Sequence, residues 1–160
     1  MPNKEALRLV TYCGLHCGLC AQRARIPKQA VQLQETLNTE GLEDFYQYAP
    51  DIRNAFPEFK RFLEKLARFD CSCRVGTGGS PDCKIRNCAR SRNVEVCALC
   101  SEYPCPRIQP MADRYPLLLT DGKHMKEIGV ERWVEEQERR AKSGFSYSDI
   151  RHPRKQHGST

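Results

Sequence analysis

Cysteine thiols are the side chains of this sequence that are best suited to chemistry. The chain has ten, and seven of them fall between Cys71 and Cys105. The other three form a tight cluster between Cys13 and Cys20, with one cysteine at position 17. Thiolates are soft donors that select zinc or iron–sulfur clusters over magnesium or calcium. The sequence therefore predicts a metal–thiolate protein.

Two cysteine pairs have the spacing that lets two sulfurs reach one ion from a single turn, Cys17/Cys20 and Cys97/Cys100. A structural zinc site takes four ligands, commonly two such pairs from separate segments. Ten sulfurs suffice for two four-ligand sites with two spare, and spacing alone does not say which cysteines share an ion. We therefore treat all ten as candidate zinc ligands: Cys13, Cys17, Cys20, Cys71, Cys73, Cys83, Cys88, Cys97, Cys100 and Cys105.

Iron–sulfur chemistry is the alternative to zinc. The spacing Cys13-x3-Cys17-x2-Cys20 is also the one that radical S-adenosylmethionine enzymes use for a 4Fe–4S cluster. Such an enzyme needs a large part of an α/β barrel, and full barrels take about 200 residues or more. The pattern after Cys20 is helical instead, which argues against that class. A 4Fe–4S cluster in a redox or sensor protein stays open as the alternative.

The ends and hydropathy of the chain predict a cytoplasmic protein with no membrane association. The first residues lack the basic and apolar regions of a signal peptide. No apolar stretch approaches the length of a membrane span. Disulfides are rare in the cytoplasm, so metal binding is the favoured role for the thiols. In an exported protein the ten cysteines would instead form five bridges.

The net charge of +6 raises nucleic-acid binding as a weaker alternative. A nucleic-acid surface should show a large, segregated excess of bases. Here the excess is small and is greatest among the cysteines. We interpret these cations as groups that offset anionic metal–thiolate centres, and do not expect nucleic acid as a partner. They are Arg74, Lys84, Arg86, Arg90 and Arg92.

No catalytic arrangement stands out in the sequence. Paired carboxylates and a Ser–His arrangement are both missing. His16 lies inside the first cysteine cluster. It is a candidate metal ligand, or a hydrogen-bond donor to a cysteine that binds the metal. His124 is expected on a surface helix, and His152 and His157 in a solvated basic tail. The sequence favours a structural zinc module for an unidentified protein partner over an enzyme.

The elements that must position the thiols are mainly α. Helices are expected at 26–40 and 42–49, the second ended by Pro50, and another is expected to start at Pro57. Residues 71–82 read as loop and 83–93 as a short helix that carries two cysteines. The helix that starts at Pro57 has a periodic apolar face that we expect to be buried: Phe59, Phe62, Leu63, Leu66 and Phe69.

The C-terminal part is also predicted to be helical. One helix is expected at 123–128 up to Gly129, and a second from Val130 to Lys142. Trp133 is expected to anchor the second helix on a face that it shares with Val130, Val134 and Gln137. The whole reads as a small helical domain with an irregular cysteine-rich metal-stapled subdomain. Residues 1–110 form the metal-binding domain, and residues 111–160 form a helical extension and basic tail packed on it.

The cysteines stand in motifs that include residues of defined type beside them. The motifs are Tyr12-Cys13-Gly14-Leu15-x-Cys17-x-x-Cys20, Cys71, Cys83-Lys-Ile-Arg-Asn-Cys88-Ala, Val96-Cys97-x-x-Cys100 and Tyr103-Pro104-Cys105, with a further segment from Ile128-Gly129 to Trp133. This pattern resembles the prokaryotic family catalogued as domain of unknown function 3795. Two departures are His16, where members often have Asp, and Cys71-Ser-Cys73 in place of a Cys-x-x-Cys pair. The resemblance implies metal binding through these cysteines and leaves the biochemical role open.

Overall fold

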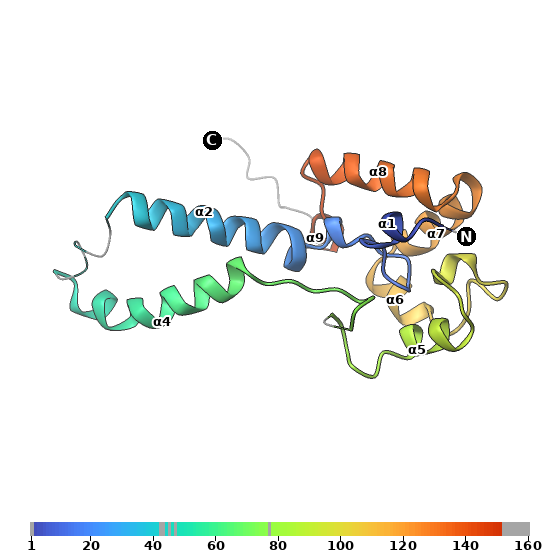
Figure 1. Cartoon of the computed structure of the whole chain (residues 1–160), viewed down its shortest axis with the longest axis horizontal. Helices are drawn as coiled ribbons and strands as arrows, with labels where there is room; N and C mark the ends of the chain where they lie inside the picture. Colours follow the sequence, from blue (N-terminus) through green and yellow to red (C-terminus); the bar gives the residue numbers. More distant parts are fainter. Residues whose placement is uncertain (1, 42–43, 45, 47, 77, 152–160) are drawn as a thin grey trace. The chain divides into compact units, whose positions relative to one another are not determined.

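The computed structural model describes residues 2–41, 44, 46, 48–76 and 78–151, and it is mainly helical, as predicted (Figure 1). The described residues form no β-sheet and contain one isolated bridge, between Val10 and His16. In this part of the chain no helix is long and apolar enough to cross a membrane. The helices are α1 (Lys4–Leu7), α2 (Ile26–Thr39), α4 (Pro50–Ala67), α5 (Lys84–Ser91), α6 (Gln109–Arg114), α7 (Leu117–Ile128), α8 (Val130–Lys142) and α9 (Tyr147–Arg151).

The chain divides into two compact units. Residues 1–21 and 71–160 form the first, here called the thiol unit because it contains all ten cysteines. Residues 22–70 form the second, here called the hairpin unit because α2 and α4 run antiparallel within it (Figure 1). The thiol unit is therefore assembled from two separate stretches of chain.

The predicted helix starts are confirmed at α2 and wrong at α4. Pro27 lies in the first turn of α2, and Gly41 follows the helix with a positive φ of 62°. Helix α4 already begins at Pro50, and Pro57 lies inside it. An internal proline removes one backbone hydrogen bond, and the helix-forming residues on either side outweigh that loss. Part of the predicted 42–49 helix lies outside the described residues, and Pro50 starts a helix rather than ending one.

The apolar face predicted to be buried on α4 is mostly exposed. Leu63 is buried, at 4% exposure. Phe59, Phe62 and Phe69 are exposed at 41%, 58% and 46%. Helix periodicity identifies an apolar face, but a two-helix hairpin can cover only one stripe of it.

The main core of the thiol unit lies under α8. The predicted bounds of α8 are confirmed, and so is its buried face, with Trp133 fully buried. Helix α7 begins at Leu117, six residues before the predicted start, and Gly129 ends it with a φ of 87°. Helices α1, α6 and α9 were not predicted because each is only one or two turns long. The buried core residues are Leu7, Val10, Val96, Ala98, Met125, Val130, Trp133 and Val134.

Two arginines organise the cysteine-rich loop by binding backbone carbonyls. Buried Arg86 donates to the carbonyl oxygens of Gly78, Ser80 and Pro81 at 2.7–3.0 Å. Arg74 donates to Leu7 and Val10 carbonyls and to the Glu95 side chain. Hydrogen bonds to a charged donor are about twice as strong as neutral ones. These two cations therefore hold the loop itself, a role that is additional to the predicted compensation of metal-centre charge.

Tyr147 fixes the first cysteine cluster to the C-terminal part of the chain. Its hydroxyl accepts a hydrogen bond from the buried backbone N–H of His16 at 2.9 Å. Burial raises the pKa of this phenol, so the hydroxyl stays protonated. The replacement Tyr147→Phe removes the acceptor, and should lower the free energy of unfolding by about 1–3 kcal/mol. Urea denaturation measures this loss, and an unchanged midpoint would show that the bond contributes nothing.

Candidate metal centre

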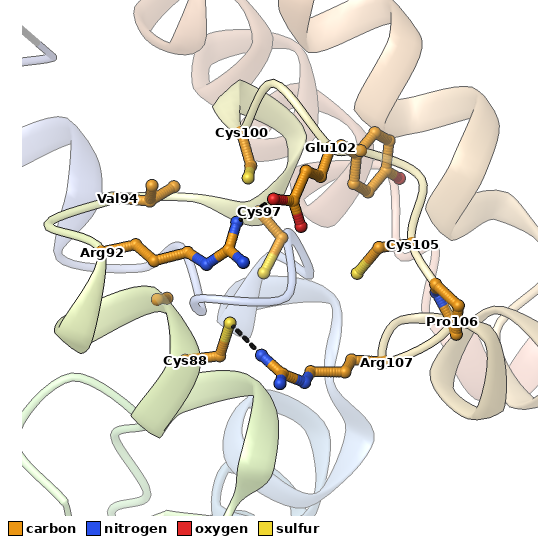
Figure 2. A pocket seen from close by; sticks show the side chains of 11 residues that line it. Cys88, Arg92, Val94, Cys97, Cys100, Glu102, Cys105, Pro106 and Arg107 are labelled. Carbon is orange, nitrogen blue, oxygen red and sulfur yellow. Dashed lines mark hydrogen bonds and ion pairs between the residues drawn. The ribbon is translucent and has the colours of Figure 1, made fainter.

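Four thiols line one pocket of about 280 Å³, here called the thiol pocket: Cys88, Cys97, Cys100 and Cys105. Cys88 comes from α5, Cys97 and Cys100 from the turn at residues 97–100, and Cys105 from the loop that follows. Figure 2 shows the sulfur atoms of Cys88, Cys97 and Cys105 turned toward the same space. Three short segments thus bring soft donors to a single place.

Backbone hydrogen bonds set the position of the Cys97 turn. Residues Cys97–Leu99 form one 3-10 turn, closed by the bond from Cys100 N–H to the Cys97 carbonyl at 2.9 Å. The N–H of Cys97 itself donates to the carbonyl of Tyr12 at 2.7 Å. This bond brings the first cysteine cluster against the later segment, with Cys13 next to Tyr12. The two cysteine-bearing segments therefore contact each other at this point.

Helix α7 supports the Cys105 loop through Tyr103. The Tyr103 hydroxyl donates to the Leu118 carbonyl at 3.0 Å. Gly122 lies where the Tyr103 ring crosses the helix, and a Cβ at this position would collide with the ring. A glycine is therefore required for this close approach. The ring in turn lines the thiol pocket.

Burial and neighbouring thiols raise the pKa of two cysteines, Cys97 and Cys13. The pKa of Cys97 is raised to about 12, mainly by burial. The thiols of Cys13, Cys105, Cys88 and Cys100 raise this pKa further. The pKa of Cys13 is also raised, first by burial, then in part by Cys73 and Cys83. Grouped thiolates repel, so without a cation Cys97 is a neutral thiol at pH 7. Cys13 interacts electrostatically with Cys97 in the thiol pocket, and also with Cys73 and Cys83 outside it.

Two arginines at the thiol pocket supply positive charge. Arg107 donates from Nη1 to the sulfur of Cys88 at 2.7 Å (Figure 2). Arg92 forms an ion pair with Glu102 at 2.6 Å, and this pair also lines the pocket. The pKa of Arg92 is raised first by Glu102 and further by the sulfurs of Cys88 and Cys100. Arg92 was among the cations predicted to lie near metal centres, and Arg107 was not, although it follows Cys105 by two residues.

The other candidate ligands do not line the thiol pocket. The Cys71 sulfur lies directly against Gly78, at a place that any Cβ there would occupy. The turn Cys17–Leu19 packs against α8, and Cys17 is buried there. Cys20 follows this turn and is partly buried. The two Cys-x-x-Cys pairs therefore adopt the same 3-10 turn and occupy different surroundings.

The two described histidines contact residues outside the thiol pocket. His16 is buried, and its ring meets Trp133 edge-on with centroids 6.1 Å apart. His124 lies on α7 and contacts Glu136 at 2.8 Å, as expected for a surface helix. His152 and His157 lie outside the described residues. His16 therefore packs in the core beside the cysteine turn rather than at the thiol pocket.

The donor set of the thiol pocket fits zinc in number and type, because a structural zinc site takes four thiolates. All ten cysteines lie in the described part of the chain, and none forms a disulfide. Among the described residues, no group of three or more His, Cys, Asp or Glu side chains is arranged so that it could hold a metal ion. The four cysteines line a common space, and their sulfur atoms do not meet around one point.

The fold and the site define a mainly helical, cysteine-rich protein with a cluster of free thiols. The chain belongs to a family described as a protein of unknown function, DUF3795, which matches residues 9–110. The match spans more than half of the chain and includes all ten cysteines, so the resemblance seen in the sequence is confirmed. Comparison with curated proteins and with solved structures gives no match.

Proposed function

We propose that the thiol pocket binds one zinc ion through Cys88, Cys97, Cys100 and Cys105, and that the protein is a structural zinc module. The observation that carries this proposal is the convergence of four thiols from three segments on one pocket. Four thiolates around zinc form a closed structural site with no open position for a substrate. The module would then present a folded surface to a protein partner, in a reducing compartment such as the cytoplasm.

Zinc binding would couple to the folding of this region. Metal binding needs deprotonated thiols, and the ion offsets the mutual repulsion that opposes thiolates here. Because the four sulfurs do not yet meet around one point, binding should draw α5, the Cys97 turn and the Cys105 loop together. Ala89, Val96, Ala98 and Ile108 are buried near this segment and give it apolar contacts. A bound ion would add its binding free energy to the stability that these contacts supply.

A second zinc ion would take its ligands from Cys13, Cys71, Cys73 and Cys83. The electrostatic influence of Cys73 and Cys83 on Cys13 supports this grouping. Cys71 belongs to the same loop, which Arg86 holds by its carbonyl groups. Two four-ligand sites would leave Cys17 and Cys20 as the two spare thiols.

Metal analysis of protein purified without oxygen tests this proposal. We expect up to two zinc ions per chain and a colourless preparation. Stoichiometric iron with inorganic sulfide, in a brown preparation, would replace zinc by the iron–sulfur alternative. A chain that folds with neither metal would overturn both readings.

Arg107 is expected to tune the affinity of the thiol pocket. Its guanidinium donates to the Cys88 sulfur, so Arg107→Gln should weaken zinc binding about tenfold and leave the stoichiometry unchanged. Competition with a coloured chelator measures the affinity. The control is Arg114→Gln on α6, an exposed arginine that does not line the pocket. Equal affinities in the two variants would show that Arg107 does not act on the site.

A further inference from the structure

The exposed apolar surface of this protein is concentrated in the hairpin unit. Of the eleven large hydrophobic side chains that are exposed among the described residues, eight belong to this unit. Among its described residues only Ala30 and Leu63 are buried. A unit of this size with so small a core needs a further surface to pack on. The eight exposed side chains are Ile26, Val31, Leu33, Tyr48, Ile52, Phe59, Phe62 and Phe69.

The exposed residues of α4 follow a heptad pattern. Ile52, Phe59 and Leu66 are seven residues apart, and a second series starts three residues later with Ala55 and Phe62. Phe69 continues the second series two residues beyond the end of α4. These are the a and d positions of a coiled-coil seam. Leu66 is half-buried and the other five are exposed. Buried Leu63 lies on the neighbouring face, so α4 carries one covered face and one open seam.

We propose that this seam is a self-association surface, where α4 of one chain packs antiparallel against α4 of a second copy. Glu58 and Lys65 both flank the seam at g positions, seven residues apart. In antiparallel coiled coils the g positions of the two helices face each other. Glu58 of each copy then lies near Lys65 of the other, which gives two ion pairs across the interface. The same orientation sets Phe59 opposite Phe62 of the second copy.

Charge favours a second copy over an anionic partner. The hairpin unit, residues 22–70, has eight Lys and Arg residues and eight Asp and Glu residues, so its net charge is zero. The whole excess of +6 belongs to the thiol unit. A neutral apolar surface does not repel a copy of itself, and nucleic acid or an anionic membrane finds no excess of cations on it.

The exposed area is of the size that a small dimer needs. At about 200 Å² for each phenylalanine side chain, the exposed fractions of Phe59, Phe62 and Phe69 leave about 290 Å² per chain. Two copies offer about 580 Å² from these rings alone, nearly half of the about 1,200 Å² of a small specific interface. The aliphatic seam residues and the charged side chains beside them supply the rest. Phe62, Phe69, Glu58 and Lys65 also line one open groove of about 780 Å³.

Light scattering of the full chain tests the surface. The wild type should be a dimer at tens of micromolar, and Phe62→Glu should raise the dimer Kd by about 100-fold or more. Because Phe62 is 58% exposed, circular dichroism should show unchanged helicity. Val75→Glu is the matched control, since Val75 is 74% exposed in the thiol unit and should leave the dimer intact. A wild type that stays monomeric at about 100 µM, or a dimer that survives Phe62→Glu, overturns the proposal.

Charge reversal tests the antiparallel arrangement. Glu58→Lys and Lys65→Glu each set like charges across the seam, so each should weaken the dimer. The double variant E58K/K65E restores both pairs and should return the Kd to within about threefold of wild type. The two positions are two turns apart within one helix and are not neighbours there. Single variants as tight as wild type, or a double variant without rescue, would overturn the antiparallel arrangement.

Discussion

Replacing Cys97 with serine is expected to remove one zinc ion per chain and to unfold the segment around it. Serine keeps the size of the side chain and loses the soft donor. Apparent binding free energies of structural zinc are on the order of 10–16 kcal/mol and are coupled to folding. Loss of even part of this energy should lower the melting temperature by about 10 °C or more. Elemental analysis and calorimetry give the two readouts.

The matched control for this variant is Cys20→Ser. Both cysteines belong to Cys-x-x-Cys pairs that fold into 3-10 turns, but Cys20 does not line the thiol pocket. We expect Cys20→Ser to keep the full zinc content and a melting temperature close to that of the wild type. If Cys97→Ser also kept both, the assignment of ligands to the thiol pocket would be wrong.

Trp133→Ala should cause the largest loss of stability that does not involve metal. Trp133 lies on the buried face of α8, is fully buried and contacts the ring of His16. Truncation of a buried tryptophan to alanine costs about 3–5 kcal/mol, because the surroundings only partly fill the cavity. This is a large share of the 5–15 kcal/mol that typically stabilises a domain. Chemical denaturation of the purified protein measures the change.

A phenylalanine at the same position separates volume from polarity. Trp133 Nε1 has no hydrogen-bond partner among the described residues. Trp133→Phe removes that donor along with part of the ring, so its cost should stay below about 2 kcal/mol. If the alanine variant unfolded at the wild-type denaturant concentration, Trp133 would not be the anchor of α8.

Long periodic segments could be predicted from the sequence, and short ones could not. The bounds and buried face of α8 follow from apolar residues at helical spacing. Helices α6 and α9, of six and five residues, are too short to show a period. Proline is common in the first turn of a helix, so Pro57 predicts a helix start, but Pro50 fills that position. The prediction of a buried face on α4 was wrong because amphipathicity does not identify what covers a helix.

The cysteines were found as candidates, but their grouping depends on tertiary structure. Cys88 joins the Cys97 turn because α5 and the loop at Cys105 pack around it, and no local spacing encodes that arrangement. Likewise, Cys17 and Cys97 have equal local spacing, yet one turn packs on α8 and the other at the thiol pocket. Arg86 and Arg74 were predicted as counter-charges to metal centres, and their hydrogen bonds to backbone carbonyls were not predicted, because a composition count does not show hydrogen-bond partners.

The hairpin unit is an insertion within the thiol unit, and its two ends meet at the ion pair between Arg23 and Asp70 at 3.0 Å. During translation the first 21 residues therefore emerge about 50 residues before the chain that completes their unit. At the usual 5–20 residues per second, Cys13, Cys17 and Cys20 spend several seconds as nascent thiols. The order of synthesis thus makes these three cysteines the ones most exposed to oxidation, or to binding of a non-cognate metal ion, while the chain is still on the ribosome.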